Sequence, residues 1–197
     1  MDLQEVIRRR KMVRSFEDRP IPPEILDRIL RNWRRAPSAG FSQGLALLVL
    51  EGKAETSRYW DALMPAERRG RWGWPDLFNA PVLIACLSSK EVYLSRYAEP
   101  DKGWTDRSES HWPVPYWHVD AGMAAMIVLL DAVDAGLGAL FFGVFDQARF
   151  RETFGVPDEW AAVGMIALGY PKPVDRPSPS LARGRKPVAE VIHRGRW

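Results

Sequence analysis

The sequence predicts an α+β fold in which helices cover a sheet of buried strands. Apolar residues recur at helical spacing over 24–35, which predicts an amphipathic helix. Two continuous apolar runs of strand length, 45–50 and 82–87, are typical of strands that are covered on both faces. Residues 118–135 carry the strongest helical signal and are apolar nearly all round, as in a central, buried helix.

The N-terminal half alternates helices with proline-rich turns. A short helix is predicted at 3–10, and three prolines then precede the helix at 24–35. Pro37 ends this second helix, because proline disfavours helical geometry in the residue before it. A further helix is predicted at 53–64, after the first strand, and an irregular stretch at 65–79.

The C-terminal half begins with the second buried strand. Residues 93–117 hold prolines, glycines, aromatics and charges without a clear period, which predicts a long loop or lid. After the central helix we expect a short strand or turn at 139–145, a helix at 147–154 and a strand at 161–168. The chain shows no internal repeat and no linker, so a single domain over 1–197 is predicted.

The last stretch of the chain, from about 173 to 197, is rich in proline and arginine. Such a segment cannot bury much within its own chain, although Val191, Ile192 and Trp197 need cover. We therefore expect a C-terminal arm that wraps a partner subunit in a homodimer.

Composition places the chain among ordinary globular proteins: 46% of its 197 residues are hydrophobic and 27% are charged. The longest apolar stretch, 121–130, is shorter than a membrane span, so no membrane partner is expected. The first residues lack the apolar core of a signal peptide. Cys86 is the only cysteine, which excludes an internal disulfide and favours the cytoplasm.

The net charge of +3 does not indicate a nucleic-acid partner. The 28 Lys and Arg residues are nearly balanced by 25 Asp and Glu residues, and the two signs are interleaved along the chain. Proteins that bind polyanions usually gather their basic residues on one face. No DNA- or RNA-binding motif is present.

Basic residues gather near both ends of the chain. Arg10, Lys11 and Arg14 lie within five residues of one another, and Arg183 and Arg185 lie one residue apart. Guanidinium groups bind a phosphate through paired, charge-assisted hydrogen bonds. On these residues alone, a solvated basic face is the favoured interpretation of the N-terminal cluster, and a disordered basic tail stays open for the C-terminal pair.

Two further segments are candidates for a binding site. The loop around Pro37, Ser38, Ala39 and Gln43 consists of small and turn-forming residues, and it is either a plain helix-to-strand connection or a ligand-binding loop. The segment 136–146 holds Phe141, Phe142 and Gly143, and glycine there permits close approach to the backbone. Its alternative interpretation is a helix end followed by a core strand.

Nothing in the sequence indicates a metal site or an acid–base pair. The three histidines and one cysteine do not have metal-ligand spacing, and a capping or core role is the better interpretation of His118. No Gly-x-Gly-x-x-Gly segment follows a strand, so a Rossmann nucleotide site is not predicted.

In this order, the four segments resemble the FMN-dependent nitroreductase family. The family opens with two basic residues, a serine, an aliphatic residue, a basic residue and a later phenylalanine; here Met12 stands at the serine position. In the loop, Phe41 stands where the family usually has asparagine and Gly44 where it has proline. The Gly-Leu-Gly segment at 136–138 also follows the family pattern.

The resemblance implies a mostly antiparallel sheet flanked by helices, an intertwined homodimer, and FMN held between the subunits. It implies an NAD(P)H oxidoreductase that reduces a nitroaromatic, quinone or enone acceptor in ping-pong fashion without a catalytic side chain. Trp104, Trp112 and Trp117 are candidates to cover the acceptor. The implied cofactor-binding residues are Arg10, Lys11, Met12, Arg14, Pro37, Ser38, Ala39, Gln43, Phe141, Phe142, Gly143, Arg183 and Arg185.

Two alternatives stay open at this point. The departures at Met12 and Phe41 are compatible with a flavin-fragmenting or dehalogenating enzyme of the same fold, or with a member that uses another cofactor. A non-catalytic flavin-binding protein is the alternative from another functional class.

Overall fold

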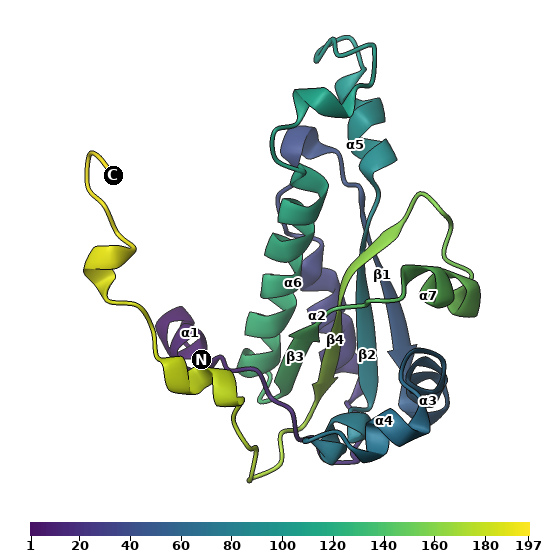
Figure 1. The fold of residues 1–197 in the computed structure, drawn as a ribbon, viewed down its shortest axis with the longest axis vertical. Coiled ribbons are helices and arrows are strands. Elements are labelled where there is room, and N and C mark those ends of the chain that lie inside the picture. Colours follow the sequence, from purple (N-terminus) through teal and green to yellow (C-terminus); the bar gives the residue numbers. More distant parts are fainter.

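The computed structural model describes all 197 residues and shows a four-stranded antiparallel sheet with helices on both faces (Figure 1). The sheet order is β1-β2-β4-β3, and each neighbouring pair is antiparallel. This arrangement confirms the predicted α+β class. The strands are β1 (Leu45–Glu51), β2 (Val82–Ser88), β3 (Gly138–Phe142) and β4 (Ala161–Gly169).

Each face of the sheet has its own hydrophobic core, because successive residues of a strand point to opposite faces. Ile84 and Ile166 pack on one face beneath α2 (Pro23–Trp33) and α6 (Tyr116–Asp134). Leu83 and Met165 pack on the other face, beneath α3 (Gly52–Leu63) and α7 (Gln147–Phe154). All seven residues of β2 are buried, as its apolar run predicts.

The first strand differs from its prediction. β1 lies at an edge of the sheet with only β2 beside it, and Leu50 is its only fully buried residue. The continuous apolar run is therefore only half covered within this chain.

Two predicted irregular regions contain helices. Helix α5 (Lys90–Tyr97) follows β2 almost directly and overlaps the start of the predicted loop at 93–117. Helix α4 (Ala66–Gly70) lies within the stretch predicted as irregular. Short 3₁₀ turns occupy Ala39–Phe41, Pro75–Asn79, Glu109–His111, Pro179–Arg183 and Val188–Glu190.

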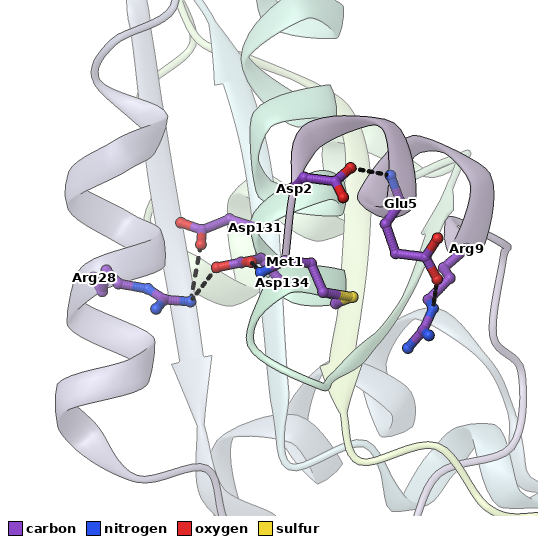
Figure 2. Close-up of polar contacts among 7 residues, drawn as sticks. All are labelled: Met1, Asp2, Glu5, Arg9, Arg28, Asp131 and Asp134. Atoms are coloured by element: carbon purple, nitrogen blue, oxygen red, sulfur yellow. Dashed lines mark hydrogen bonds and ion pairs between the residues drawn. The ribbon is translucent and has the colours of Figure 1, made fainter.

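Helix α1 (Leu3–Arg9) is attached to the C-terminal end of α6 through the chain's first residue (Figure 2). The amino group of Met1 lies 2.6 Å from Asp134 Oδ1, and Arg28 Nη2 of α2 lies 3.6 Å from Asp134 Oδ2 and 3.1 Å from Asp131 Oδ1. The Met1 amino group is the main cause that lowers the pKa of Asp134, with Arg28 contributing. Three elements distant in sequence thus meet at one set of ion pairs.

Helix α6 is long and apolar enough, by length and composition alone, to cross a membrane. Its inner face is packed on the sheet, with Ala124, Ala125, Val128 and Ala132 buried. A core helix of a globular domain passes the same test.

Candidate functional site

The residues that follow α1 lie along the outer edge of β3. Val13 N donates to Ala139 O at 3.0 Å, and Met12 forms an isolated parallel bridge with Ala139. Gly138 makes this approach possible, because a Cβ there would lie 2.7–2.9 Å from side-chain atoms of Val13. The N-terminal basic run and β3, two of the predicted site segments, are therefore brought together.

The cations of this run are poorly neutralised. Lys11 is the only one of the three with an ion-pair partner, Asp175 Oδ2 at 3.7 Å. Arg14 Nη1 donates to Met12 O at 3.1 Å, and its guanidinium carbon lies 5.4 Å from the ring centroid of Trp74. Arg10 and Arg14 thus retain guanidinium N–H groups that a phosphate could accept from.

Asp175 lies next to this run, and the sequence analysis did not single it out. Its Oδ1 accepts a hydrogen bond from Arg14 N at 3.0 Å. Lys172 N donates to Ser15 O at 2.9 Å, and Trp74 Nε1 donates to Arg176 O at 2.7 Å. The first part of the predicted arm is therefore held by its own chain.

The remainder of the C-terminal segment, 179–197, is exposed throughout and extends away from the sheet in Figure 1. Arg183 and Arg185 lie in it, and both are exposed. Their predicted role at the phosphate stays a prediction.

The loop between α2 and β1 has an unusual backbone. Gly40, Phe41 and Gln43 have φ angles of 60°, 53° and 55°, in the left-handed region that non-glycine residues seldom adopt. Such conformations persist only where the surroundings hold them, and they cluster at ligand sites. Phe41 and Gln43 both point outward and are exposed.

Hydrogen bonds hold this loop from several sides. Gln43 N donates to Ser38 Oγ at 3.1 Å, and Ser42 Oγ donates to Ala39 O at 2.6 Å. Arg96 Nε, from α5, donates to Gly40 O at 3.0 Å. The exposed side chains of the loop are thus carried on a fixed backbone.

The central contact of the loop is Asp120, on the first turns of α6. Its side chain is almost completely buried, and one oxygen, Oδ2, accepts from Ala39 N at 2.8 Å and from Tyr93 Oη at 2.7 Å. Burial first, and then the bond to Asp120, raise the pKa of the Tyr93 hydroxyl. The signal in the sequence was an aspartate that stands between apolar residues of α6, Val119 and Ala121, since aspartates are buried only when paired.

The two halves of the predicted site are separated within one chain. The loop is bonded to Asp120 near the start of α6, whereas the basic run follows α1, which is attached to Asp134 at its end. At 1.5 Å per residue, these two points on α6 are about 20 Å apart.

The two aromatic side chains of β3 pack against other residues of the same chain. Phe142 stacks on Trp60 with ring centroids 5.6 Å apart, and Phe141 packs against the position where a Cβ of Gly164 would lie. Gly143, directly after β3, is exposed, so its backbone is accessible. The predicted roles of Phe141, Phe142 and Gly143 stay predictions.

A cavity of about 670 Å³ opens beside the loop, within the usual size range of ligand pockets. Ser38, Phe41 and Gln43 line it from the loop. A second, basic wall comes from the C-terminal end of α2 and the residues that follow it.

The tryptophans of the predicted lid pack on one another. Trp112 lies 4.5 Å from Tyr97, 5.4 Å from Trp104 and 5.9 Å from Trp117, measured between ring centroids. Trp117 is buried. The segment after α5 is thus a packed aromatic cluster, in which these rings already have partners.

Two further titratable groups, His118 and Cys86, have pKa values shifted by burial. His118 Nδ1 lies 3.3 Å from Ser88 Oγ, and burial lowers the pKa of this imidazole. Burial raises the pKa of the Cys86 thiol to about 12, so that this group stays protonated at neutral pH. No cluster of three or more His, Cys, Asp or Glu residues has the arrangement of a metal site.

A sequence model of the Nitroreductase family matches residues 7–170, which include the basic run, the loop and β3. The chain belongs to the Nitroreductase family. This membership confirms the resemblance noted in the sequence and supports an oxidoreductase.

Individual relatives of this nitroreductase-family chain are distant. An NADH dehydrogenase of Thermus thermophilus is 26% identical over 92% of both chains. A 5,6-dimethylbenzimidazole synthase of Rhodospirillum rubrum is 27% identical over 88% of this chain and 83% of that protein. The solved structure of a nitroreductase family protein from Clostridium difficile 630 aligns over 100% of both chains with a TM-score of 0.73 at 20% identity, a likeness in fold.

Proposed function

We propose that this protein is an FMN-dependent NAD(P)H oxidoreductase that reduces a nitroaromatic, quinone or enone acceptor in ping-pong fashion. The observation that carries the proposal is the pair of half-sites at the two ends of α6. One is the loop with left-handed backbone at Gly40, Phe41 and Gln43, which is hydrogen-bonded to buried Asp120 through Ala39 N. The other is the basic run on the edge of β3.

The residues present fit the cofactor. Arg10, Lys11 and Arg14 would hold the phosphate of FMN, and Met12 offers its backbone where the family usually has a serine. The exposed backbone at Gly143, farther along the same edge, gives a flat ring access to main-chain groups. When bound, FMN supplies the redox chemistry, which no side chain of this protein can supply.

A homodimer would unite the two half-sites. Apolar side chains of α6 face solvent in one chain: Val119, Met123 and Met126 are 38%, 39% and 43% exposed. If two copies pack these faces in an isologous contact, the loop of one subunit approaches the basic run of its partner. The exposed arm, with Arg183 and Arg185, is then free to reach across the same interface.

The chain's own residues bind and orient the reactants. Loop residues Pro37, Ser38, Ala39 and Gln43 would lie along the edge of the flavin, and Asp120 fixes their backbone. Since hydride transfer passes directly between stacked rings, no side chain is required as an acid or base, and water can deliver protons. We place the enzyme in the cytoplasm, because its single cysteine is buried and unpaired.

A second candidate is a flavin-fragmenting member of the same fold. Its support is the pair of departures at Met12 and Phe41, together with the relative named 5,6-dimethylbenzimidazole synthase. The dimethylbenzene ring of that compound is also part of FMN. Such an enzyme would consume its flavin, whereas an oxidoreductase returns it unchanged.

The first test of the proposal is the identity of the cofactor that the purified protein contains. We expect a yellow protein that releases a compound with the mass of FMN on denaturation. Arg14→Ala should remove a charge-assisted contact of about 1.5–3 kcal/mol, or roughly a ten- to hundred-fold loss in FMN affinity. Arg8→Ala, on the exposed side of α1, is the matched control and should retain FMN. Equal FMN retention in both variants would contradict the assigned phosphate site.

Turnover separates the two candidates. With NADH or NADPH and a nitroarene or quinone, an oxidoreductase consumes many equivalents of donor per flavin, and the flavin content stays constant. Stoichiometric loss of flavin with release of a dimethylbenzene product would favour the second candidate. A colourless protein that binds no flavin would overturn both.

A further inference from the structure

The basic wall of the cavity consists of three arginines at the end of α2. Arg34 and Arg35 follow Arg31 by three and four residues, at and just beyond the C-cap of α2, and all three line the cavity. None of them has an ion-pair partner, although Arg28 on the same helix is paired with Asp131. Three like charges around one cavity repel each other unless an anion lies between them.

A helix end by itself favours cations, and this is the simpler explanation for one arginine. It does not explain the rest of the cavity. Phe41 has a φ of 53°, a backbone conformation that costs energy. Its side chain is also 74% exposed, which leaves an apolar ring in water. In the wall, Trp33 Nε1 is buried without a hydrogen-bond partner.

The cavity thus combines a flat apolar ring, the amide of Gln43, and guanidinium groups. A ligand that matches this set has a planar ring near one end and a phosphate-type anion at the other. The basic part of the exposed C-terminal segment does not match it, since Arg183, Arg185 and Lys186 carry the same sign of charge as the wall. The FMN phosphate is also a poor candidate, because the proposed function already assigns it to Arg10, Lys11 and Arg14.

We propose that Arg31, Arg34 and Arg35 bind the diphosphate of the nicotinamide dinucleotide donor while its nicotinamide end lies by the loop at Phe41 and Gln43. This inference rests on the proposed function and assigns the donor's anionic part to residues that the family resemblance does not include. Binding of this kind weakens as salt concentration rises, because the arginines are exposed.

Direct binding tests the site without turnover. The full-length protein is titrated calorimetrically with ADP, which carries a diphosphate and no nicotinamide. The double variant Arg34→Gln/Arg35→Gln should bind ADP at least tenfold more weakly than the original protein. The control Arg68→Gln removes one charge from α4, at the opposite end of the sheet in Figure 1, and should stay within about twofold. Equal ADP affinity in all three proteins, or no ADP binding at millimolar concentrations, would overturn the inference.

A kinetic comparison shows whether the anion that the three arginines bind belongs to the electron donor or to the acceptor. Bound flavin is reduced anaerobically with NADH or with N-benzyl-1,4-dihydronicotinamide, which has the reacting ring and no diphosphate. The double variant should lower kcat/KM for NADH at least tenfold more than it lowers kcat/KM for the benzyl compound. An equal loss with both donors, or a loss confined to anionic acceptors, would overturn the inference. Because ADP binding needs no flavin, a flavin-free protein would contradict the proposed function and leave the binding test intact.

Discussion

At the scale of single residues, Asp120 is the group on which the candidate loop depends. One of its oxygens accepts two hydrogen bonds, from Ala39 N and from Tyr93 Oη, in a buried position. Asp120→Ala leaves both donors without a partner, which should lower the free energy of unfolding by about 2–4 kcal/mol. Urea unfolding measures this loss, and FMN affinity should fall with it because the loop backbone is released.

A milder variant distinguishes the contact of Asp120 with the loop from its contact with the core residue Tyr93. Tyr93→Phe removes one of the two bonds and keeps the contact of Asp120 with Ala39, so we expect a cost of only about 1 kcal/mol and near-normal FMN affinity. If Tyr93→Phe weakens FMN as strongly as Asp120→Ala, the loop is not held in the way described.

His118 is a residue-scale case with a pH dependence. Burial lowers the pKa of its imidazole below the usual 6.5. The unfolded chain therefore binds this proton more readily, and stability should fall as pH drops from above 6.5 through the folded-state pKa. His118→Asn should flatten this part of the stability–pH curve in thermal melts between pH 8 and 5.

The same variant tests the absence of an acid–base residue. General acid–base groups typically contribute 10²- to 10⁴-fold to rate. A folded, FMN-loaded His118→Asn protein should therefore lose less than about tenfold in activity. A thousand-fold loss would show that His118 is catalytic.

At the scale of elements, the N-terminal segment depends on a glycine in β3. A Cβ at Gly138 would lie 2.7 Å from Val13 Cγ2 and 2.9 Å from Val13 Cβ, so that Val13 would have to shift away from β3. Gly138→Ala should cost about 1–3 kcal/mol and weaken FMN binding, because the basic run is displaced from the sheet edge. Gly70→Ala in α4 is the control, since a Cβ there meets no atom within 4 Å. Equal stability of the two variants would contradict this docking.

Elements could be predicted where burial left a pattern in the sequence. The runs at 45–50 and 82–87 became β1 and β2 with ends shifted by one residue, since buried strands are apolar throughout. Helix α5 was missed because few of its residues are buried, and its tertiary contact, from Tyr93 to Asp120, is distant in sequence. Local pattern carries no information on such a partner.

The candidate site was predictable only in part for the same reason. Arginine clusters and small-residue loops are visible in sequence, and both fall inside the matched family region. The left-handed backbone at Phe41 and Gln43 was not visible, because neither residue type favours it. Asp175 beside Arg14 could not be found either, since 161 residues separate the pair.

At the scale of the whole molecule, the two proposed half-sites lie apart along α6 within one chain. The points on α6 to which the two half-sites are tied, Asp120 and Asp134, lie about 20 Å apart within a single subunit. If two copies pack around a two-fold axis across the outer face of α6, the loop of one subunit lies close to the basic run of the other. The same contact covers Met123 and Met126. Dimerisation and flavin binding should therefore be lost together.

The variant Met123→Glu/Met126→Glu places two charges on that face, one helical turn apart. Burying unpaired carboxylates in an apolar contact is strongly unfavourable, so the protein should become a monomer in analytical ultracentrifugation and lose its absorbance near 450 nm. The surface positions are exposed in the single chain, so its fold should persist by circular dichroism. Met126→Leu keeps an apolar side chain of similar size and should remain dimeric and yellow. A doubly charged variant that is still a yellow dimer would exclude this face as the interface and would require another route between the half-sites.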